Sequence, residues 1–527
     1  MVTTQRTRPE QSTPTPSEKA RIVAAIDVGS NALRMVIAEV LADGRIEVLE
    51  RLQRAVRLGQ DAFRRGRLGG QSMRAAVNIL QDYRQLLRLY EVERVRAVAT
   101  SAVREASNSD TFLDRVFMAT ALNLEVIGTA EESRLTVSAV RAAVGDSLGV
   151  NEGRSLIVDV GGGSTLLTLL DDGEIVTSHS LRLGSIRLQE WLATGEEPPR
   201  RSAEILRHQI INAMKTAQTA LGLPSIKSFV AVGGDARFAA REAGHPTNAP
   251  DLASVDRADL RKLVDKCQDF TPEGLSRRYG LPFAEAETLN PALMVYQLLL
   301  ERTESEAIIV SHVSMRDGLL LQLARDVTGQ EDEDLQRGIV HSAMALAEHY
   351  RVDVRHAGDV ADVALRLFDL LQSDHGLGVK ERLLLRVAAL LHEVGGFVSN
   401  RSHHKHSYYL ISNSEIFGLG RDDVELVALV ARYHRRSAPK PSHMEYTRLT
   451  RDRRVMVNKL AALLRLADAM VRGHDATHHD LQLERQGDEL IVAAPDVAEL
   501  LIEQRAIAAK GDMFEDVYGM KVRVEEA

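Results

Sequence analysis

One pattern occurs twice in the first half of the chain and strongly limits what the chain can fold into. Residues 22–31 read IVAAIDVGSN and residues 155–164 read SLIVDVGGGS, so each copy is an apolar strand that ends in an aspartate and a glycine-bearing turn. A second strand pattern and an Asp-Gly turn follow each copy, at residues 43–44 and 172–173. A unit that recurs in this way predicts a duplicated α/β core with a cleft between its two halves.

The chemistry of these turns favours phosphate as the ligand. Small residues after a strand let backbone N–H groups converge on a phosphate oxygen. An aspartate at the strand end can hold Mg²⁺ together with the phosphates of a substrate. One such turn alone is better interpreted as an ordinary tight turn, but the duplication favours a phosphate site. Neither copy is a Walker A loop, because Gly-Lys-Ser/Thr and the following helix are absent. Neither copy is a dinucleotide-binding GxGxxG motif that opens a helix.

The composition limits which classes of binding partner and which cellular compartment fit this chain. The formal net charge of −8 argues against attraction of a polyanion to the whole surface, so any positive charge for an anionic substrate must be local. Aromatic residues make up only 4% of the chain, which argues against a base-stacking nucleic-acid surface. The single cysteine, Cys267, excludes an intrachain disulfide and fits a reducing cytosol. Without a run of about 18 apolar residues we expect no membrane span and a cytoplasmic protein.

The histidines mark a change of domain. Four of the 17 lie before residue 340 and 13 lie after it, and the acidic stretch 329–338 precedes the change. Helical periodicity dominates from about residue 338 to 480, and a hairpin around Gly487-Asp488 and a strand at 521–526 follow. We predict a disordered tail at 1–20, two lobes at 21–145 and 146–328, a helical domain at 329–480 and a small α+β subdomain at 481–527.

Seven ordered blocks in the core resemble the exopolyphosphatase/guanosine pentaphosphate phosphohydrolase (Ppx/GppA) family. They are IDVGSNALRMVI (26–37), AVRLGQ (55–60), AVATSAVREASN (97–108), IGTAEESRL (127–135), IVDVGGGST (157–165), SLRLGSIRL (180–188) and SMRDGLLLQ (314–322). The similarity continues through residues 390–415 and 428–436, which resemble the helical extension of the long members of the family. The resemblance implies a two-lobed, actin/hexokinase-like (ribonuclease H-like) core followed by an all-α HD-type domain.

The same resemblance implies attack by water on a terminal phosphoanhydride. The substrate would be inorganic polyphosphate, from which an exopolyphosphatase releases orthophosphate, or alternatively the 5′-triphosphate end of guanosine pentaphosphate. Glu132 would be the general base, since a carboxylate within hydrogen-bond reach can orient water and accept its proton. Glu131 and Glu132 also fit helix N-terminal acids after Thr129, and both interpretations hold if Glu131 caps the helix and Glu132 faces the cleft.

The family pattern also assigns the metal and the phosphate ligands. Mg²⁺ (or Mn²⁺) would be held by Asp159, with Asp27 opposite it. Arginine suits phosphate because its planar fork binds two oxygens at once. The residues assigned to phosphate binding are Gly29, Ser30, Asn31, Arg34, Arg104, Gly161, Gly162, Gly163, Ser164, Thr165 and Arg316, with Arg57 as a weaker candidate.

Two positions depart from the family pattern. The family places a glutamate after the second turn, where this chain has Leu166, and leucine cannot bind a metal ion. In the third loop, residues 231–240 read AVGGDARFAA, so the carboxylate of Asp235 would repel phosphate unless a metal ion or Arg237 offsets its charge. A third interpretation is therefore a catalytically weakened regulator that binds polyphosphate or the alarmone.

The helical domain carries residues in the order of an HD phosphohydrolase, namely His356, His392, Glu393, His434 and Asp468. Glu393 stands where HD enzymes have aspartate, so we expect a bundle whose histidines pack and hydrogen-bond rather than a second catalytic centre. Substrate binding or formation of a homodimer is the favoured role of this domain. The residues expected to form a local basic surface for a polyanion are His403, His404, Lys405, His406, Arg432, Arg435 and Arg436.

Overall fold

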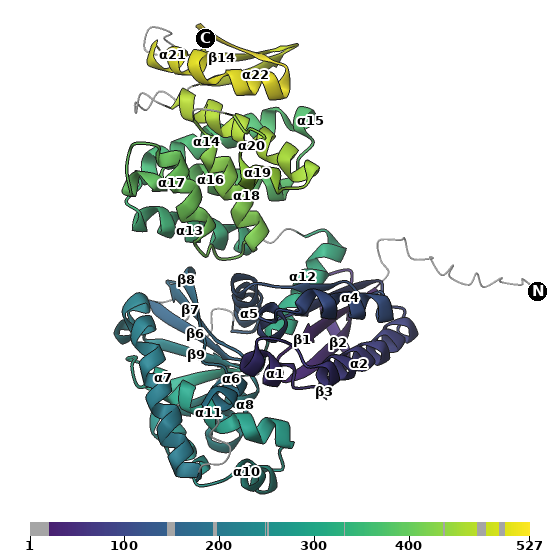
Figure 1. Cartoon of the computed structure of the whole chain (residues 1–527). Coiled ribbons are helices and arrows are strands. Elements are labelled where there is room, and N and C mark those ends of the chain that lie inside the picture. Colours follow the sequence, from purple (N-terminus) through teal and green to yellow (C-terminus); the bar gives the residue numbers. More distant parts are fainter. Residues whose placement is uncertain are drawn as a thin grey trace, which may run out of the picture. The chain divides into compact units, whose positions relative to one another are not determined.

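The computed structural model describes residues 20–144, 153–192, 198–247, 249, 252–330, 333–435, 438–471, 481–494 and 501–526. The chain forms two compact units (Figure 1). The first comprises Met1–Leu167 and His179–Asp332, and the second comprises Thr168–Ser178 and Glu333–Ala527. The predicted tail lies outside the described residues, apart from residue 20.

The first sheet of the core has five strands in the order β3-β2-β1-β4-β5. β1 pairs antiparallel with β2 and parallel with β4. The strands are β1 (Arg21–Val28), β2 (Ala32–Val40), β3 (Ile46–Ala55), β4 (Arg94–Ala99) and β5 (Leu124–Val126). The helices of this lobe are α1 (Leu58–Arg65), α2 (Gly70–Leu89), α3 (Ser101–Arg104), α4 (Ser109–Thr120) and α5 (Thr129–Val144).

Both faces of this sheet are covered, which explains why β1 reads as an almost continuous apolar run. Ala24 and Ile26 pack on one face with side chains of α2 and α4. Val23 and Ala25 point to the other face and pack with Leu135 of α5 and with α12 (Met315–Thr328). The alternation fixes the register of β1 and thereby places Asp27 at its carboxyl end.

The second sheet has the order β10-β11-β12-β9-β6-β7-β8. Its segment β8-β7-β6-β9-β12 repeats the order of the first sheet, and β6 again pairs parallel with the strand that follows the hairpin, β9. The strands are β6 (Arg154–Val160), β7 (Thr165–Asp171), β8 (Glu174–Leu181), β9 (Ser228–Val232), β10 (His245–Pro246), β11 (Leu252–Asp256) and β12 (Ala307–Ser311). The helices are α6 (Ser185–Leu192), α7 (Pro199–Leu221), α8 (Gly234–Ala243), α9 (Arg257–Cys267), α10 (Pro272–Tyr279) and α11 (Phe283–Leu300), with a 3₁₀ turn at Leu223–Ser225.

The C-terminal unit is largely helical, with one small sheet. Its helices are α13 (Glu333–His349), α14 (Val354–Leu370), α15 (Gln372–His375), α16 (Val379–Leu391), α17 (His403–Ser412), α18 (Arg421–Arg432), α19 (Met444–Thr447), α20 (Arg451–Met470), α21 (Leu501–Lys510) and α22 (Asp512–Tyr518), with a 3₁₀ turn at Val394–Phe397. The sheet has the order β13-β14-β15, from β13 (Gln482–Gln486), β14 (Glu489–Ala494) and β15 (Lys521–Glu526). One apolar core runs through the helices and this sheet.

The predicted duplication of a mixed α/β core and the helical C-terminal region are confirmed. The hairpin predicted around Gly487-Asp488 is also confirmed, because Gln486 pairs with Glu489 across it. The exact limits of the four folded domains remain predictions. No helix in the described ranges is both long and apolar enough to cross a membrane.

The packing of α5 against α12 generates a prediction about stability. A Cβ atom on Gly318 of α12 would lie 2.0 Å from the carbonyl oxygen of Leu135 in α5. Gly318→Ala therefore forces the two helices apart, and we expect it to lower the free energy of unfolding by about 1–3 kcal/mol. Gly70→Ala is the matched control, because its Cβ would meet only the flexible end of Arg74, at 3.6 Å. Denaturant unfolding of both variants checks this, and an unchanged midpoint for Gly318→Ala would contradict it.

Candidate functional site

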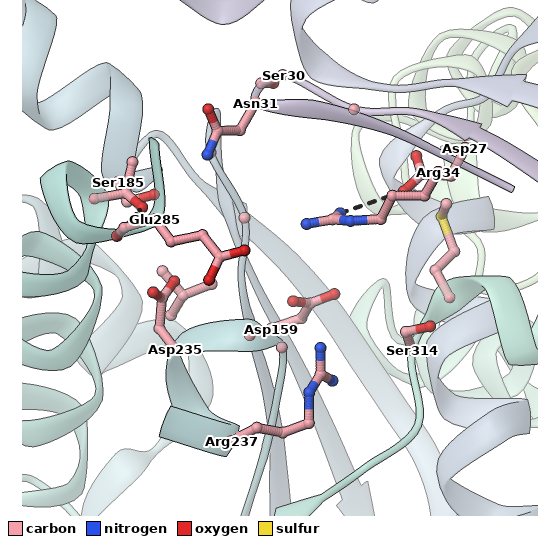
Figure 2. Close-up of a pocket in the computed structure, with 18 of the residues that line it drawn as sticks. Asp27, Ser30, Asn31, Arg34, Asp159, Ser185, Asp235, Arg237, Glu285 and Ser314 are labelled. Carbon is pink, nitrogen blue, oxygen red and sulfur yellow. Dashed lines mark hydrogen bonds and ion pairs between the residues drawn. The ribbon is translucent and has the colours of Figure 1, made fainter. Parts of the chain in front are cut away.

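A cavity of about 580 Å³ in the first unit is lined by both glycine turns. Figure 2 shows side chains from the two halves of the core facing this space. The sequence-predicted residues that line it are Asp27, Gly29, Ser30, Asn31, Arg34, Glu132, Asp159, Gly161, Gly162, Ser164 and Arg316. The cavity therefore brings most of the predicted site together from distant parts of the sequence.

The first turn connects β1 to β2 and is held from both sides. The Gly29 amide donates to the carbonyl of Ala32 at 3.2 Å, which closes the turn. The Ser30 and Ser101 hydroxyls share a hydrogen bond of 3.0 Å. Asn31 Nδ2 donates to the carbonyl of Ala284 at 2.9 Å, in the other half of the core. The turn is thus a fixed part of the cavity wall.

The second turn packs tightly against Ser30 of the first turn and against Ser101 at the start of α3. A Cβ on Gly163 would lie 2.2 Å from Ser101 Oγ, and a Cβ on Gly162 would lie 3.1 Å from Ser30 Cβ. Gly163 itself does not appear among the lining residues, so its part is this close approach. Thr165 is fully buried and donates to the carbonyl of Leu183 at 2.9 Å, so its hydroxyl is used within the fold.

Glu132 lies in the first turn of α5, only 7% exposed, and lines the cavity. Its Oε1 accepts a hydrogen bond of 2.5 Å from Arg104 Nη1, which also donates to the carbonyl of Ile127. Burial raises the pKa of Glu132 to about 7, with Arg104 lowering it and Asp159 adding to the rise. The neighbouring Glu131 instead accepts hydrogen bonds from Arg134 and Arg96.

The placement of Arg104 differs from the sequence-based expectation. Its guanidinium group is engaged with Glu132, and it does not occur among the residues that line the cavity. Its assigned phosphate contact stays a prediction. Arg57, the weaker candidate, forms an ion pair of 2.9 Å with Glu287 and likewise does not line the cavity.

Asp27 and Asp159 end the two equivalent strands and both line the cavity. Arg34 Nη1 lies 3.6 Å from Asp27 Oδ2. In Figure 2 the carboxylate of Asp159 lies between the guanidinium groups of Arg34 and Arg237. Burial raises the pKa of Asp159 to about 6, against the lowering influence of these two arginines. The two carboxylates supply oxygen ligands of the kind that Mg²⁺ prefers.

Arg316, at the start of α12, contributes a further guanidinium group to this space. Its Nε is buried and has no hydrogen-bond partner among the described residues. Burial and the nearby Arg34 lower the pKa of Arg316 to about 10. Because a buried cation without a full set of partners is costly, this position is suited to an anion.

The two departures from the family pattern both face the cavity. Leu166 is 6% exposed and contributes an apolar wall where a carboxylate was expected. Asp235 follows Gly233 and Gly234 at the start of α8 and faces Glu285 of α11 (Figure 2). Burial and the charge of Glu285 raise the pKa of Asp235 to about 7, so its carboxyl group is partly protonated at neutral pH.

Several lining residues were missed by the sequence reasoning. Ser101 and Ser314 lie within blocks that carried the resemblance, so the signal was present but was not used. Ser185 follows the glycine of another such block. Glu285 had no local signal, because it belongs to a helix outside all seven blocks.

In the helical unit, the structure brings the predicted HD-type residues together. The ligand atoms of His356, His392 and Glu393 all lie within 4.8 Å of one another. His392 Nε2 lies 3.8 Å from Asp468 Oδ1, and the His392 and His434 rings are 4.9 Å apart.

The predicted basic surface of the helical unit is wrong in part. His403 and His404 are each only 8% exposed, because they belong to the inner face of α17. Arg432 pairs with Glu445 at 3.4 Å, so its charge is partly offset. Arg436 lies outside the described residues.

Comparisons with known proteins agree with this arrangement. A relative described as guanosine-5′-triphosphate,3′-diphosphate pyrophosphatase from Vibrio vulnificus is 26% identical over 490 residues, covering 90% of this chain and 91% of that protein. Exopolyphosphatase 2 from Mycobacterium tuberculosis is 31% identical over 318 residues, covering 57% of this chain and 98% of that protein. The solved exopolyphosphatase from Cytophaga hutchinsonii shares the fold of the core, with a TM-score of 0.52 and 22% identity over 58% of this chain and 98% of that one.

Family profiles cover both units. The profile described as the Ppx/GppA phosphatase family matches residues 36–326, and the profile described as domain III of the same phosphatases matches residues 340–502. The first match begins within β2, so it includes most of both halves of the core but not Asp27, the first turn or Arg34. This profile matches the core, and the mycobacterial relative is 31% identical to the chain over 98% of its own length. The chain therefore belongs to the Ppx/GppA phosphatase family.

Proposed function

We propose that this chain is an exopolyphosphatase that hydrolyses the terminal phosphoanhydride of inorganic polyphosphate and releases orthophosphate. The observation that carries the proposal is the cavity in which two facing glycine turns, two strand-end aspartates and Glu132 meet. The name of the mycobacterial relative supports the same activity. A cytoplasmic homodimer is the state that we propose for the protein.

The carboxylate oxygens that line the cavity fit Mg²⁺ or Mn²⁺ as a partner better than they fit the arginines alone. Asp27 and Asp159 would hold the ion, and the substrate phosphates would complete its ligands. Burial raises the pKa of Asp159 and Asp235, and the lowering influence of Arg34 and Arg237 does not cancel that rise. When bound, the ion supplies positive charge to the phosphate oxygens. Leu166 removes one oxygen ligand, so this site depends on fewer carboxylates than the family pattern provides.

Glu132 is the residue that we assign to the attacking water. Arg104 holds its Oε1, which leaves Oε2 to accept a hydrogen bond from water and then its proton. The pKa of about 7 makes the carboxylate a stronger base than an exposed glutamate while keeping much of it ionised at neutral pH. Arg104 is thus a positioning residue that fixes the orientation of the base.

Three arginines hold the substrate in this proposal. Arg34, Arg237 and Arg316 line the cavity and surround the two strand-end aspartates. Their charges neutralise phosphate oxygens, and catalysis rests mainly on positioning and charge, as in phosphoryl transfer generally. The hydroxyls of Ser30 and Ser164 and the backbone of both turns add hydrogen-bonding groups to the same wall.

Guanosine pentaphosphate is the second candidate substrate. It is favoured by the Vibrio relative, which covers both units and whose name refers to that nucleotide. The same residues would act on the terminal phosphoanhydride of either substrate. Comparing kcat/KM for long-chain polyphosphate and for guanosine pentaphosphate separates the two, and tight binding of either without turnover would instead favour a regulator weakened at Leu166.

Replacement of Glu132 tests the proposed base. Glu132→Gln keeps the shape but cannot accept a proton, so we expect phosphate release from polyphosphate to fall about 10²- to 10⁴-fold with binding retained. Glu131→Gln is the matched control, because Glu131 pairs with Arg134 and Arg96 instead. Undiminished release by Glu132→Gln would remove Glu132 from the reaction.

The pH dependence follows from the same carboxylate. Protonated Glu132 cannot act as a base, so kcat/KM should fall as the pH drops below about 7. Arg104 lowers the pKa of Glu132, so Arg104→Met should move this acid limb to higher pH. Initial rates between about pH 5 and 9, roughly the range in which such a group titrates, measure the acid limb of the wild type and of Arg104→Met. The free Mg²⁺ concentration is held fixed. An acid limb at the same pH in both proteins would speak against the assignment.

Substrate affinity tests the arginine cluster. Arg316→Met removes a cation whose Nε has no hydrogen-bond partner in the described part of the chain. We expect the KM for polyphosphate to rise roughly 10- to 100-fold, as for loss of a charged hydrogen bond. Arg57→Met should leave KM near the wild-type value, because Arg57 pairs with Glu287 away from the lining residues. Equal KM values for the two variants would show that Arg316 does not contact the substrate.

A further inference from the structure

The first turn of α6 holds the backbone carbonyls of the second glycine turn. The backbone amides of the first three residues of α6 donate to the carbonyls of Gly161 and Gly162 at 3.0–3.1 Å. Arg187, the third residue of this helix, also reaches the next carbonyl with its side chain, because its Nε donates to the carbonyl of Gly163 at 2.6 Å. Three successive carbonyls of the turn therefore point towards α6.

The direction of these carbonyls fixes the direction of the amides that follow them. The C=O and N–H groups of a planar trans peptide point in opposite directions. The amides of Gly162, Gly163 and Ser164 must therefore point away from α6. Within the described part of the chain none of these three amides donates a hydrogen bond to a backbone carbonyl, and Gly162 and Ser164 line the cavity. Successive backbone amides with a common direction form a binding site for an anion.

The side chain of Arg187 is held in place by contacts with two other elements. Its Nη2 pairs with Glu105 Oε1 at 2.5 Å, and Glu105 directly follows α3. Its guanidinium group lies 4.1 Å from the centre of the Phe63 ring of α1. Arg187 is only 7% exposed, so these directed contacts lie in surroundings where water does not compete for them. The hydrogen bond to Gly163 thus comes from a guanidinium group of fixed orientation.

The partner of Arg187 lies next to the residue that orients the proposed base. Arg104 ends α3 and holds Glu132, whereas the following residue, Glu105, holds Arg187. One short helix therefore anchors both Glu132 and the second glycine turn. Neither Arg187 nor Glu105 is among the residues that line the cavity, so neither side chain contacts a ligand there.

We propose that Arg187 is a positioning residue that, together with Glu105, orients the peptide unit between Gly163 and Ser164 for the binding of a phosphate group. The guanidinium group holds the carbonyl side of this peptide, and the amide side is presented to the anion. This role rests on the proposed function, because it takes phosphate as the ligand of the second turn. It is separate from the role of Arg104, which acts on the base and not on the turn.

The binding of inorganic phosphate to the full chain tests the role of Arg187. In Arg187→Met we expect the Kd for inorganic phosphate to rise about 10-fold, because a turn that is not held in one orientation presents its amides less often. The KM for polyphosphate should rise in the same proportion, while the acid limb of kcat/KM stays at the wild-type pH. Arg182→Met is the matched control, because Arg182 pairs with the same Glu105 at 2.9 Å but is 78% exposed. Isothermal titration calorimetry measures the Kd values, and circular dichroism checks that each variant is folded.

Glu105→Gln gives a second measurement that leaves Arg187 in the chain. It removes the charge that holds the guanidinium group, so we expect weaker phosphate binding than in the wild type but stronger binding than in Arg187→Met. Because Glu105 acts through Arg187, the double variant should bind phosphate no more weakly than Arg187→Met alone.

Three results would overturn the positioning role. They are an unchanged Kd for phosphate in folded Arg187→Met, an effect of Glu105→Gln that adds fully to that of Arg187→Met, and a shift of the acid limb as large as that of Arg104→Met. A wild type that binds phosphate, and binds it less tightly in Arg187→Met, but releases none from polyphosphate would contradict the proposed hydrolysis and support the role of Arg187 in phosphate binding.

Discussion

The close approach of two glycine turns is the constraint on which the core depends. A Cβ on Gly163 would lie 2.2 Å from Ser101 Oγ, and a Cβ on Gly162 would lie 2.9 Å from Ile186 Cδ1 and 3.1 Å from Ser30 Cβ. The strands that lead into these turns are β1 and β6, and Asp27 and Asp159 lie one residue before their ends. Both aspartates and both turns line the same cavity.

The cavity gathers charged side chains of both signs. Carboxylates of both halves line it together with four arginines, and burial raises the pKa of Glu132, Asp159 and Asp235 towards neutrality. A dianionic phosphate would meet the arginines, and a divalent cation would meet the aspartates. In the proposed function these arginines supply the local positive charge that a polyanion would require on a chain with a net charge of −8.

The helical unit differs from the core in the chemistry of its buried polar side chains. Its buried polar cluster is built from imidazole as well as carboxylate, and it lies within an otherwise apolar core that continues into the three-stranded sheet. Lys510 connects that C-terminal segment to Asp468 of α20 through an ion pair, and Arg465 of α20 pairs with Asp512. The two units thus hold two chemically distinct groups of buried polar side chains, one rich in carboxylate and guanidinium groups and one rich in imidazole.

The sequence by itself determined the duplicated strand-turn-strand unit, the helical C-terminal region and the hairpin at Gly487-Asp488, because each is a local pattern of apolar and turn residues. Only the tertiary structure decided that Arg104 holds Glu132, that Glu285 faces Asp235, and that His403 and His404 are buried. The physical reason is that pairing and burial depend on segments that lie tens of residues apart in the sequence. Local periodicity records which side of an element is apolar, but it does not record which partner covers that side.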